Sequence, residues 1–245
     1  MGLFAETGTV NPIFQRLTLL TGAETASALE KSGVMVVGLG GVGSWAAEAL
    51  VRSGVGRISL VDFDTVCVSN INRQLQALNS NLGRLKTEAL GERLKDINPS
   101  CEIKLFPVVF SKETSGQLDI NGADFVIDAI DTLESKLDLI ELSLAAGKRL
   151  FSSMGMAQKL DPTLIRTADI WQTSGCPLAR LVRQGLRKRG ISGHFKAVYS
   201  PERLPLREEL PDEAGTHRKA IGSAVSVTAT AGMVLASLVI RDLMS

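Results

Sequence analysis

The sequence is poor in the residues that build disulfide frameworks and zinc sites. It holds three cysteines and two histidines among 245 residues. The cysteines, Cys67, Cys101 and Cys176, lie far apart and form no Cys-x-x-Cys pair, which argues against a disulfide scaffold and against structural zinc. The first residues also lack the basic stretch and apolar run of a secretory signal. We therefore expect a protein of the reducing cytoplasm.

Neither sign of charge is in excess. Lys and Arg number 27 and Asp and Glu 26, which gives a net charge of +1. Overall charge therefore predicts no nucleic-acid binder, although it leaves room for a local basic patch. Hydrophobic residues at 44% and charged residues at 22% are typical of a globular protein and exclude disordered, collagen-like and coiled-coil chains. The length suits one large α/β domain.

Long uncharged apolar runs are scarce, with one exception at residues 220–240. This run is long enough to span a bilayer. It is, however, rich in Ala, Ser, Thr and Gly, which partition weakly into lipid and allow a helix to pack closely on its neighbours. We expect a buried core helix here and no membrane span.

Short apolar runs alternate with amphipathic segments up to about residue 155. The runs expected to form strands are 34–37, 57–62, 101–109, 124–128 and 149–153, and the segments expected to form helices are 44–53, 84–98 and 132–146. This alternation is typical of right-handed βαβ units. It predicts an α/β fold with a Rossmann-like open sheet, mostly parallel, and helices on both faces.

The pattern changes after residue 155. Residues 163–171 alternate like a half-exposed antiparallel strand, 177–189 form a basic helix, and 195–199 form a short strand. We expect one domain over 1–245. It would comprise a helical arm (1–33), a nucleotide-binding half (34–155) and a substrate-facing half (156–245) with a flexible loop at about 202–219.

A glycine-rich turn joins the first predicted strand to the first helix of the sheet. Gly38, Gly40 and Gly43 match the spacing G-x-G-x-x-G. The first glycine permits a tight turn, the second lets a phosphate approach the backbone, and the third lets helix pack on strand. Asp62 ends the second strand, where a carboxylate can accept hydrogen bonds from ribose hydroxyls. The pattern predicts a nucleotide site.

Fixed charges beyond Asp62 favour ATP over NAD. Arg73 and Lys86 supply the cations that a triphosphate needs and NAD does not. Asp131 follows the predicted strand 124–128, at the carboxyl edge of the sheet, where its carboxylate can hold Mg²⁺ against phosphate oxygens. The alternatives are an NAD-dependent oxidoreductase, which these three residues count against, and a non-catalytic nucleotide sensor.

Four motifs together resemble the E1-like adenylating superfamily of the ThiF/MoeB/HesA type. They are GxGGxGS at 38–44, DFDxVxxSNxxRQ at 62–74, GxxK at 83–86 and DAxDT at 128–132. The resemblance implies that the residues binding ATP are Gly38, Gly40, Gly41, Gly43, Asp62, Asp64, Asn70, Arg73, Gln74, Lys86 and Asp131. It also implies that Arg73, Lys86 and Asp131 act in catalysis, with Mg²⁺ at Asp131, and that Arg16 is donated by the neighbouring subunit of a homodimer.

Within this superfamily the chain resembles the dehydratases that act on threonylcarbamoyladenosine in tRNA. The stretches 42–56, 64–74, 126–132 and 160–163 carry this likeness. It implies adenylation of the carboxylate of N6-threonylcarbamoyladenosine at position 37 of tRNA, followed by ring closure to the cyclic form with loss of water. The alternative is adenylation of a ubiquitin-like sulfur carrier, whose activating enzymes usually carry two Cys-x-x-Cys pairs. A sulfur-transfer partner and a monovalent cation stay open.

Two further features lie in the second half of the chain. Cys176 is either a covalent nucleophile or a packed small residue, and intramolecular ring closure needs no thiol. The cations Arg180, Arg183, Arg187, Lys188 and Arg189 form a basic stretch in a nearly neutral protein. We interpret the stretch as a phosphate-contact surface for tRNA, with a solvated helix face as the alternative.

Overall fold

The computed structural model describes residues 11–205, 210–211 and 219–244. Most of the loop expected at 202–219 lies outside the described residues. The strands are β1 (Gly33–Val37), β2 (Arg57–Val61), β3 (Glu102–Phe106), β4 (Phe125–Asp128), β5 (Arg149–Ser153), β6 (Arg166–Asp169), β7 (Lys196–Tyr199), β8 (Leu210–Pro211) and β9 (Lys219–Ala220).

One seven-stranded sheet organises the described residues, in the order β3-β2-β1-β4-β5-β7-β6. All neighbours in it are parallel except β6 and β7, which are antiparallel. The short β8 and β9 pair separately. β1 is buried along its whole length, as the continuous apolar run 34–37 predicts for the centre of a parallel sheet. The predicted fold class is confirmed.

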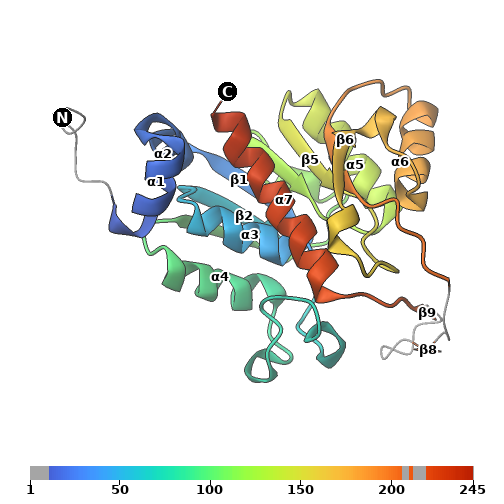
Figure 1. Cartoon of the computed structure of the whole chain (residues 1–245), viewed down its shortest axis with the longest axis horizontal. Coiled ribbons are helices and arrows are strands. Elements are labelled where there is room, and N and C mark those ends of the chain that lie inside the picture. Colours follow the sequence, from blue (N-terminus) through green and yellow to red (C-terminus); the bar gives the residue numbers. More distant parts are fainter. Residues whose placement is uncertain (1–10, 206–209, 212–218, 245) are drawn as a thin grey trace.

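Helices cover both faces of this sheet (Figure 1). They are α1 (Gln15–Thr21), α2 (Ala23–Lys31), α3 (Gly43–Arg52), α4 (Lys86–Ile97), α5 (Leu133–Ala145), α6 (Pro177–Lys188) and α7 (Val225–Leu243), with 3₁₀ turns at Pro12–Phe14, Val68–Asn70, Asn79–Asn81, Ser115–Gln117, Pro162–Leu164 and Ile170–Gln172. One apolar core joins α2, α3, α4 and α7 to the sheet, and a second joins α5 and α6 to it. This arrangement is a three-layer α/β sandwich.

The apolar run near the C-terminus forms α7, which lies beside α3 across one face of the sheet (Figure 1). Its length and hydropathy alone would suit a membrane span. A Cβ on Gly232 would lie 2.5 Å from the carbonyl oxygen of Val42 and 2.9 Å from Cβ of Trp45. This close approach needs the small residues of the run. In this structure α7 is a core helix, as we expected.

The strand expected at 163–171 is shorter than its alternation predicts. Only Arg166–Asp169 pairs with β7, and 3₁₀ turns flank it on both sides. Side-chain hydrogen bonds explain the difference. Asp161 accepts the amide N–H of Thr163 at 2.8 Å, and Asp169 accepts that of Trp171 at 2.9 Å. Such local capping by aspartate competes with strand pairing.

The strand order places the glycine-rich turn at a topological switch point. β1 lies between β2 and β4, so the connections from these central strands run to opposite sides. In open α/β sheets ligands bind at this point, beyond the carboxyl ends of the strands. Gly38 follows β1 there, Asp62 follows β2 and Asp131 follows β4. The fold therefore brings the predicted nucleotide residues to one edge.

Candidate functional site

The glycines of the turn have three different environments. Gly38 has φ +90°, and a Cβ on it would lie 2.7 Å from the carbonyl oxygen of Ala129, just beyond β4. A Cβ on Gly43 would overlap the carbonyl oxygen of Gly38, so α3 can begin here only without a side chain. Gly40 faces open space, with no atom within 4 Å of a built Cβ. The space beside Gly40, near the N-terminus of α3, is thus open to an anion.

Asp62 fastens this turn to the end of β2. Its Oδ2 accepts the amide N–H of Leu39 at 2.6 Å, and its Oδ1 accepts that of Asp64 at 2.9 Å. Burial raises the pKa of Asp62, while the charge of Lys86 and these two amides offset part of that effect. The carboxylate therefore sits beside the turn, where the sequence predicted a ribose contact.

Lys86 opens α4 and brings a buried cation to the same edge. Its Nζ lies 2.7 Å from Oδ2 of Asp64, and its side chain is 6% exposed. The Asp64 side chain is 46% exposed. Asp64 thus contacts Lys86 directly, and its exposed carboxylate holds the ammonium group close to Asp62.

Arg73 lies against the glycine-rich turn. Its Cγ would be 3.2 Å from a Cβ on Gly41, and its carbonyl oxygen accepts the indole N–H of Trp45 at 3.0 Å. The guanidinium Nη1 donates to the carbonyl oxygen of Ser69 at 2.8 Å and to Oδ1 of Asn72 at 3.0 Å. Arg73 therefore provides a half-buried cation beside the turn.

Asn70 and Gln74 belong to the same segment and have different surroundings. Oδ1 of Asn70 accepts the amide N–H of Cys67 at 3.2 Å, which stabilises the 3₁₀ turn Val68–Asn70. Gln74 is buried, and its Oε1 has no hydrogen-bond partner among the described residues. The structure thus assigns Asn70 a local structural contact and leaves an acceptor of Gln74 unused.

Sequence reasoning missed Gln76, which completes the support of the turn. This side chain is 1% exposed, and its Nε2 donates to the carbonyl oxygen of Leu39 at 2.8 Å. Because Asp62 binds the amide of the same residue, the peptide groups on both sides of Leu39 are held. The only signal in the sequence is a polar residue between Leu75 and Ala77.

Asp131 is exposed between β4 and α5, at the carboxyl edge of the sheet. Its Oδ1 accepts the hydroxyl of Thr132 at 3.4 Å. Within the described ranges, no group of three or more His, Cys, Asp or Glu side chains forms a metal cage. A magnesium ion at Asp131 would therefore take most of its ligands from phosphate oxygens and water. Protein-bound Mg²⁺ commonly has this coordination, with only one or two carboxylate ligands.

Arg16 is not brought to the nucleotide edge of its own chain. It is exposed on α1, two positions after Phe14, whose ring packs against Gly54. Gly54 follows the C-terminus of α3, whereas the glycine-rich turn opens that helix. The two ends of a ten-residue helix are about 15 Å apart. Arg16 thus lies near the far end of α3 from the turn.

Two cations of the basic stretch have polar protein partners, and the other three have none among the described residues. Arg189 forms ion pairs with Glu134 at 2.8 Å, Asp138 at 2.6 Å and Glu141 at 3.0 Å, all on α5. The Nη1 of Arg183 donates to the hydroxyl of Thr173. The remaining three are exposed on α6, with Arg187 lying 5.3 Å from the ring centre of Trp171; they are Arg180, Arg187 and Lys188.

Cys176 is buried at the start of α6, with 4% of its surface exposed. Its backbone carbonyl accepts the amide of Arg180, as in a helix N-terminus. Cys101 is buried as well, and burial raises the pKa of its thiol to about 11. Burial suits the interpretation of Cys176 as a packing residue.

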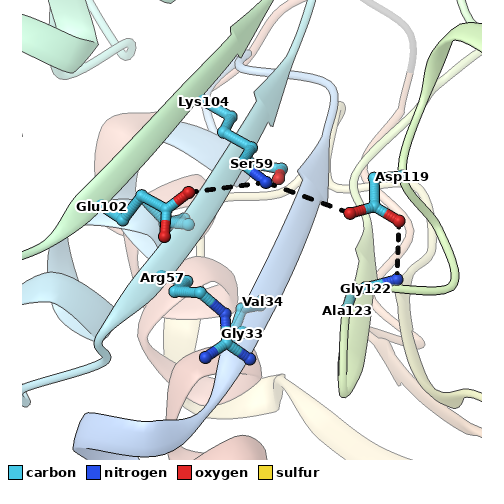
Figure 2. Close-up of a pocket in the computed structure, with 10 residues that line it drawn as sticks. Gly33, Val34, Arg57, Ser59, Glu102, Lys104, Asp119, Gly122 and Ala123 are labelled. Atoms are coloured by element: carbon cyan, nitrogen blue, oxygen red, sulfur yellow. Dashed lines mark hydrogen bonds and ion pairs between the residues drawn. The ribbon is translucent and has the colours of Figure 1, made fainter.

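A small pocket lies at the opposite edge of the sheet from these residues. It is lined at the amino ends of strands by Gly33 and Arg57, with Lys104 reaching toward Asp119 (Figure 2). Lys104 Nζ is 3.9 Å from Oδ2 of Asp119. The cavity of about 20 Å³ has room for about one water molecule. It is too small for a nucleotide.

Known proteins resemble this chain over most of its length. The chain is 42% identical over 239 residues to the tRNA threonylcarbamoyladenosine dehydratase of Bacillus subtilis, covering 94% of each chain. The crystal structure of the Escherichia coli enzyme TcdA in complex with AMP superposes with a TM-score of 0.86, at 34% identity, over 97% of this chain and 98% of that one. The crystal structure of E. coli TcdA in complex with ATP superposes with a TM-score of 0.83, at 35% identity, over 94% of this chain and 93% of that one.

Other relatives match only part of this chain. The adenylyltransferase and sulfurtransferase UBA4 of Candida glabrata is 33% identical over 148 residues, which is 60% of this chain and 34% of that protein. The family match, in contrast, runs from the N-terminal helices through the glycine-rich turn to α7. Residues 14–244 match the ThiF family, and the chain belongs to that family.

Proposed function

We propose that this protein is an ATP-dependent tRNA threonylcarbamoyladenosine dehydratase. It adenylates the carboxylate of N6-threonylcarbamoyladenosine at position 37 of tRNA and promotes its cyclisation, releasing AMP and pyrophosphate. The observation that carries the proposal is the end-to-end likeness to enzymes of this name, one of them solved with ATP and with AMP. The convergence of Asp62, Lys86 and Arg73 on the glycine-rich turn supports it.

The nucleotide would bind along the turn at the switch point. Amides of Gly40 and Gly41 would hold phosphate oxygens, and Asp62 would accept hydrogen bonds from the ribose. Lys86 and Arg73 lie close enough to the turn to neutralise the triphosphate, with Asp64 holding Lys86 in place. The buried, unpaired Oε1 of Gln74 is an acceptor that a bound nucleotide or a water could use.

Asp131 would hold a magnesium ion against the phosphates, and that ion would supply charge neutralisation on the triphosphate. The residues fit this ion because a single exposed carboxylate at the strand end complements ligands from the nucleotide. No contact among the described residues points to a monovalent cation site, and the sulfur-transfer partner stays a prediction.

Adenylation is needed because a free carboxylate has no good leaving group, whereas an acyl adenylate can expel AMP. A carboxylate oxygen attacks the α-phosphorus of ATP and forms a mixed anhydride, expelling pyrophosphate. A nucleophile in the same threonylcarbamoyl side chain then attacks the activated carbonyl, closes the ring and expels AMP. The second step is intramolecular, so proximity supplies much of its rate and the enzyme needs no thiol. Cationic side chains at the turn would stabilise charge developing on the α-phosphate.

The tRNA would approach over α6. Arg180, Arg187 and Lys188 are exposed and form no ion pair among the described residues, although Arg187 also lies over the Trp171 ring, so all three can contact backbone phosphates. Arg183 and Arg189, part of the same predicted surface, have protein partners. We therefore assign the first three residues to tRNA binding and the other two to holding α6 in place.

A homodimer would complete the site. Arg16 lies about the length of α3 away from its own turn, so it could serve only the turn of another subunit. We propose the whole chain as one domain acting in this dimer in the cytoplasm, with the half at 156–245 facing the tRNA.

The test uses purified protein, Mg-ATP and tRNA bearing threonylcarbamoyladenosine, with tRNA lacking that group as the control. The expected result is AMP release together with loss of one water from the modified nucleoside, measured by mass spectrometry after digestion. Asp131→Ala should abolish both. AMP formation that needs a ubiquitin-like protein, and leaves the tRNA unchanged, would contradict the proposal and favour protein activation.

A further inference from the structure

A fully buried ion pair lies beneath the turn that carries Asp131. Nζ of Lys136, on α5, lies 2.7 Å from Oδ2 of Asp128, the last residue of β4, and both side chains are 0% exposed. The hydroxyl of Ser152, on β5, donates to the same Oδ2 at 2.6 Å. The ammonium group also donates to the carbonyl oxygen of Ser153 at 3.0 Å. The cluster thus joins β4 and α5, which flank Asp131 in the sequence, to β5, the strand paired with β4.

Stability alone does not account for this pair. Removing two charges from water is costly, and a buried ion pair is often no more stable than an apolar pair of the same volume. All hydrogen-bond donors of the Lys136 ammonium group are also in use. The three protons of Lys136 have three acceptors, since Oγ of Ser152 lies 3.4 Å from Nζ. A saturated cluster has no donor left for a ligand, so its role is to hold other groups.

The second oxygen of Asp128 leads directly to the site. Oδ1 accepts the amide N–H of Ile130 at 3.1 Å, and Ile130 is the residue before Asp131. The preceding residue, Ala129, donates its amide to Val37 at 2.9 Å and packs its carbonyl against Gly38. One carboxylate therefore fixes the chain at Ile130, and neighbouring contacts fix the same segment to the glycine-rich turn.

We propose that Lys136 and Ser152 are positioning residues for Asp131. They hold the Asp128 carboxylate in the orientation in which its Oδ1 accepts the Ile130 amide, and this sets the distance from Asp131 to the glycine-rich turn. The inference rests on the proposed function, because Asp131 serves the reaction there. Lys136 and Ser152 act at a distance and touch neither ATP nor tRNA.

Two double variants separate positioning from stability. Asp128→Asn with Lys136→Met removes both charges and keeps an oxygen for the Ile130 amide. Asp128→Leu with Lys136→Met has nearly the same volumes and no such oxygen. We expect the first to lower kcat about threefold, because the oxygen for the Ile130 amide remains but Lys136 no longer holds it in place. A kcat equal to that of wild type in this variant would remove Lys136 from the positioning role. The second should lose kcat by about tenfold or more with the KM for ATP within about twofold, because the catalytic carboxylate is misplaced while the nucleotide is still held.

Ser152→Ala provides a milder test that does not depend on the second double variant folding. It should lower kcat about threefold with an unchanged KM for ATP. Ser143→Ala is its matched control, since Ser143 is fully buried on α5 and its hydroxyl has no hydrogen-bond partner among the described residues. We expect no change in kcat for the control.

The outcomes distinguish the inference from the proposed function. Equal kcat for the two double variants, or for Ser152→Ala and Ser143→Ala, would overturn the positioning role. A wild-type protein that forms no AMP would overturn the proposed function instead. In that case hydrogen exchange at the Ile130 amide decides the positioning. Exchange of this amide should be slow in wild type and in Asp128→Asn with Lys136→Met, and fast in Asp128→Leu with Lys136→Met. Equal exchange rates in the two double variants would refute the inference.

Discussion

The carboxylate of Glu48 on α3 binds the guanidinium of Arg93 on α4, with Nε of Arg93 2.5 Å from Oε2. Arg52, one turn further along α3, donates to Oε1 at 2.7 Å. These bonds connect the helix that follows the glycine-rich turn with the helix that begins at Lys86. Two helices of the proposed nucleotide site are thereby connected on the side of the sheet that carries α7.

Acid should weaken this connection. Burial raises the pKa of Glu48, but hydrogen bonds from Arg93 and Arg52 outweigh it, so the pKa lies below its usual 4.5. A pKa lowered by folding contributes stability above about pH 4.5, and this is lost as pH falls through the lowered value. Glu48→Gln should cost about 1 kcal/mol of unfolding free energy at pH 7, because both arginines are half-exposed and screened.

Urea unfolding of wild type and Glu48→Gln at several pH values checks this. The difference between the two proteins should be full at pH 7 and shrink toward zero in strong acid. Glu92→Gln is the control, since Glu92 forms an exposed pair with Arg84 and its loss should change little. A difference that stays constant down to acid would refute the assigned role of Glu48.

Two glycines of the turn should respond oppositely to alanine. Gly43→Ala forces a methyl group into the carbonyl oxygen of Gly38 and should cost about 3 kcal/mol of stability. Gly40→Ala meets open space, so the protein should keep its melting temperature while its affinity for ATP falls about tenfold, because the methyl group obstructs the phosphate. Calorimetry of unfolding and of ATP binding measures both effects. Equal ATP affinity in Gly40→Ala and wild type would remove the turn from phosphate binding.

Replacing a cation on α6 should have an effect that depends on whether that cation has an ion-pair partner in the protein. Replacing Arg180, Arg187 and Lys188 with Ser should weaken tRNA binding and lower the slope of log K against log salt by about 1 for each phosphate contact removed. Arg189→Ser should instead lower thermal stability with little effect on that slope, because its charge is matched by three carboxylates. Filter binding at several salt concentrations measures the slope for both variants, and thermal unfolding measures the stability of Arg189→Ser. An unchanged slope in the triple variant would exclude this face from tRNA binding.

Arg16 should act across a subunit boundary. Arg16→Ala and Asp131→Ala should each abolish AMP formation alone. In an equal mixture of exchanging subunits, about a quarter of the sites would combine an intact Asp131 with an intact Arg16 of the neighbour. Activity near that fraction after mixing is the expected result. No recovery in mixtures whose subunits demonstrably exchange would show that Arg16 does not serve the partner site.

Cys176 should be dispensable for chemistry. Cys176→Ala removes a buried sulfur at the start of α6 and should lower stability by about 1 kcal/mol. The kcat for AMP release should stay within about twofold of wild type, because ring closure within the substrate needs no enzyme nucleophile. A loss of about a hundredfold, with a thioester trapped on the wild type, would favour the covalent mechanism.

Local patterns correctly predicted which strand ends meet at the carboxyl edge of the sheet. The apolar run 34–37, the glycines after it and Asp62 at the end of the next strand are short-range features, and βαβ geometry brings such strand ends together. Sequence patterns did not predict contacts between residues that lie far apart in the sequence. Lys136 looks like an ordinary lysine of an amphipathic helix, and only β4 and β5 packing over α5 makes it a buried partner of Asp128 and Ser152.

The sequence by itself determined the α/β architecture, the glycine-rich turn and the set of charges around it, because strand and helix periods and glycine spacing act over a few residues. Tertiary structure decided which charges are free. Arg189 has few acids near it in sequence, yet it meets Glu134, Asp138 and Glu141 across the α5–α6 contact. Packing alone also set Arg16 at the far end of α3 from its own glycine-rich turn. The physical reason is that neutralisation and reach depend on distances in space, which sequence spacing does not encode.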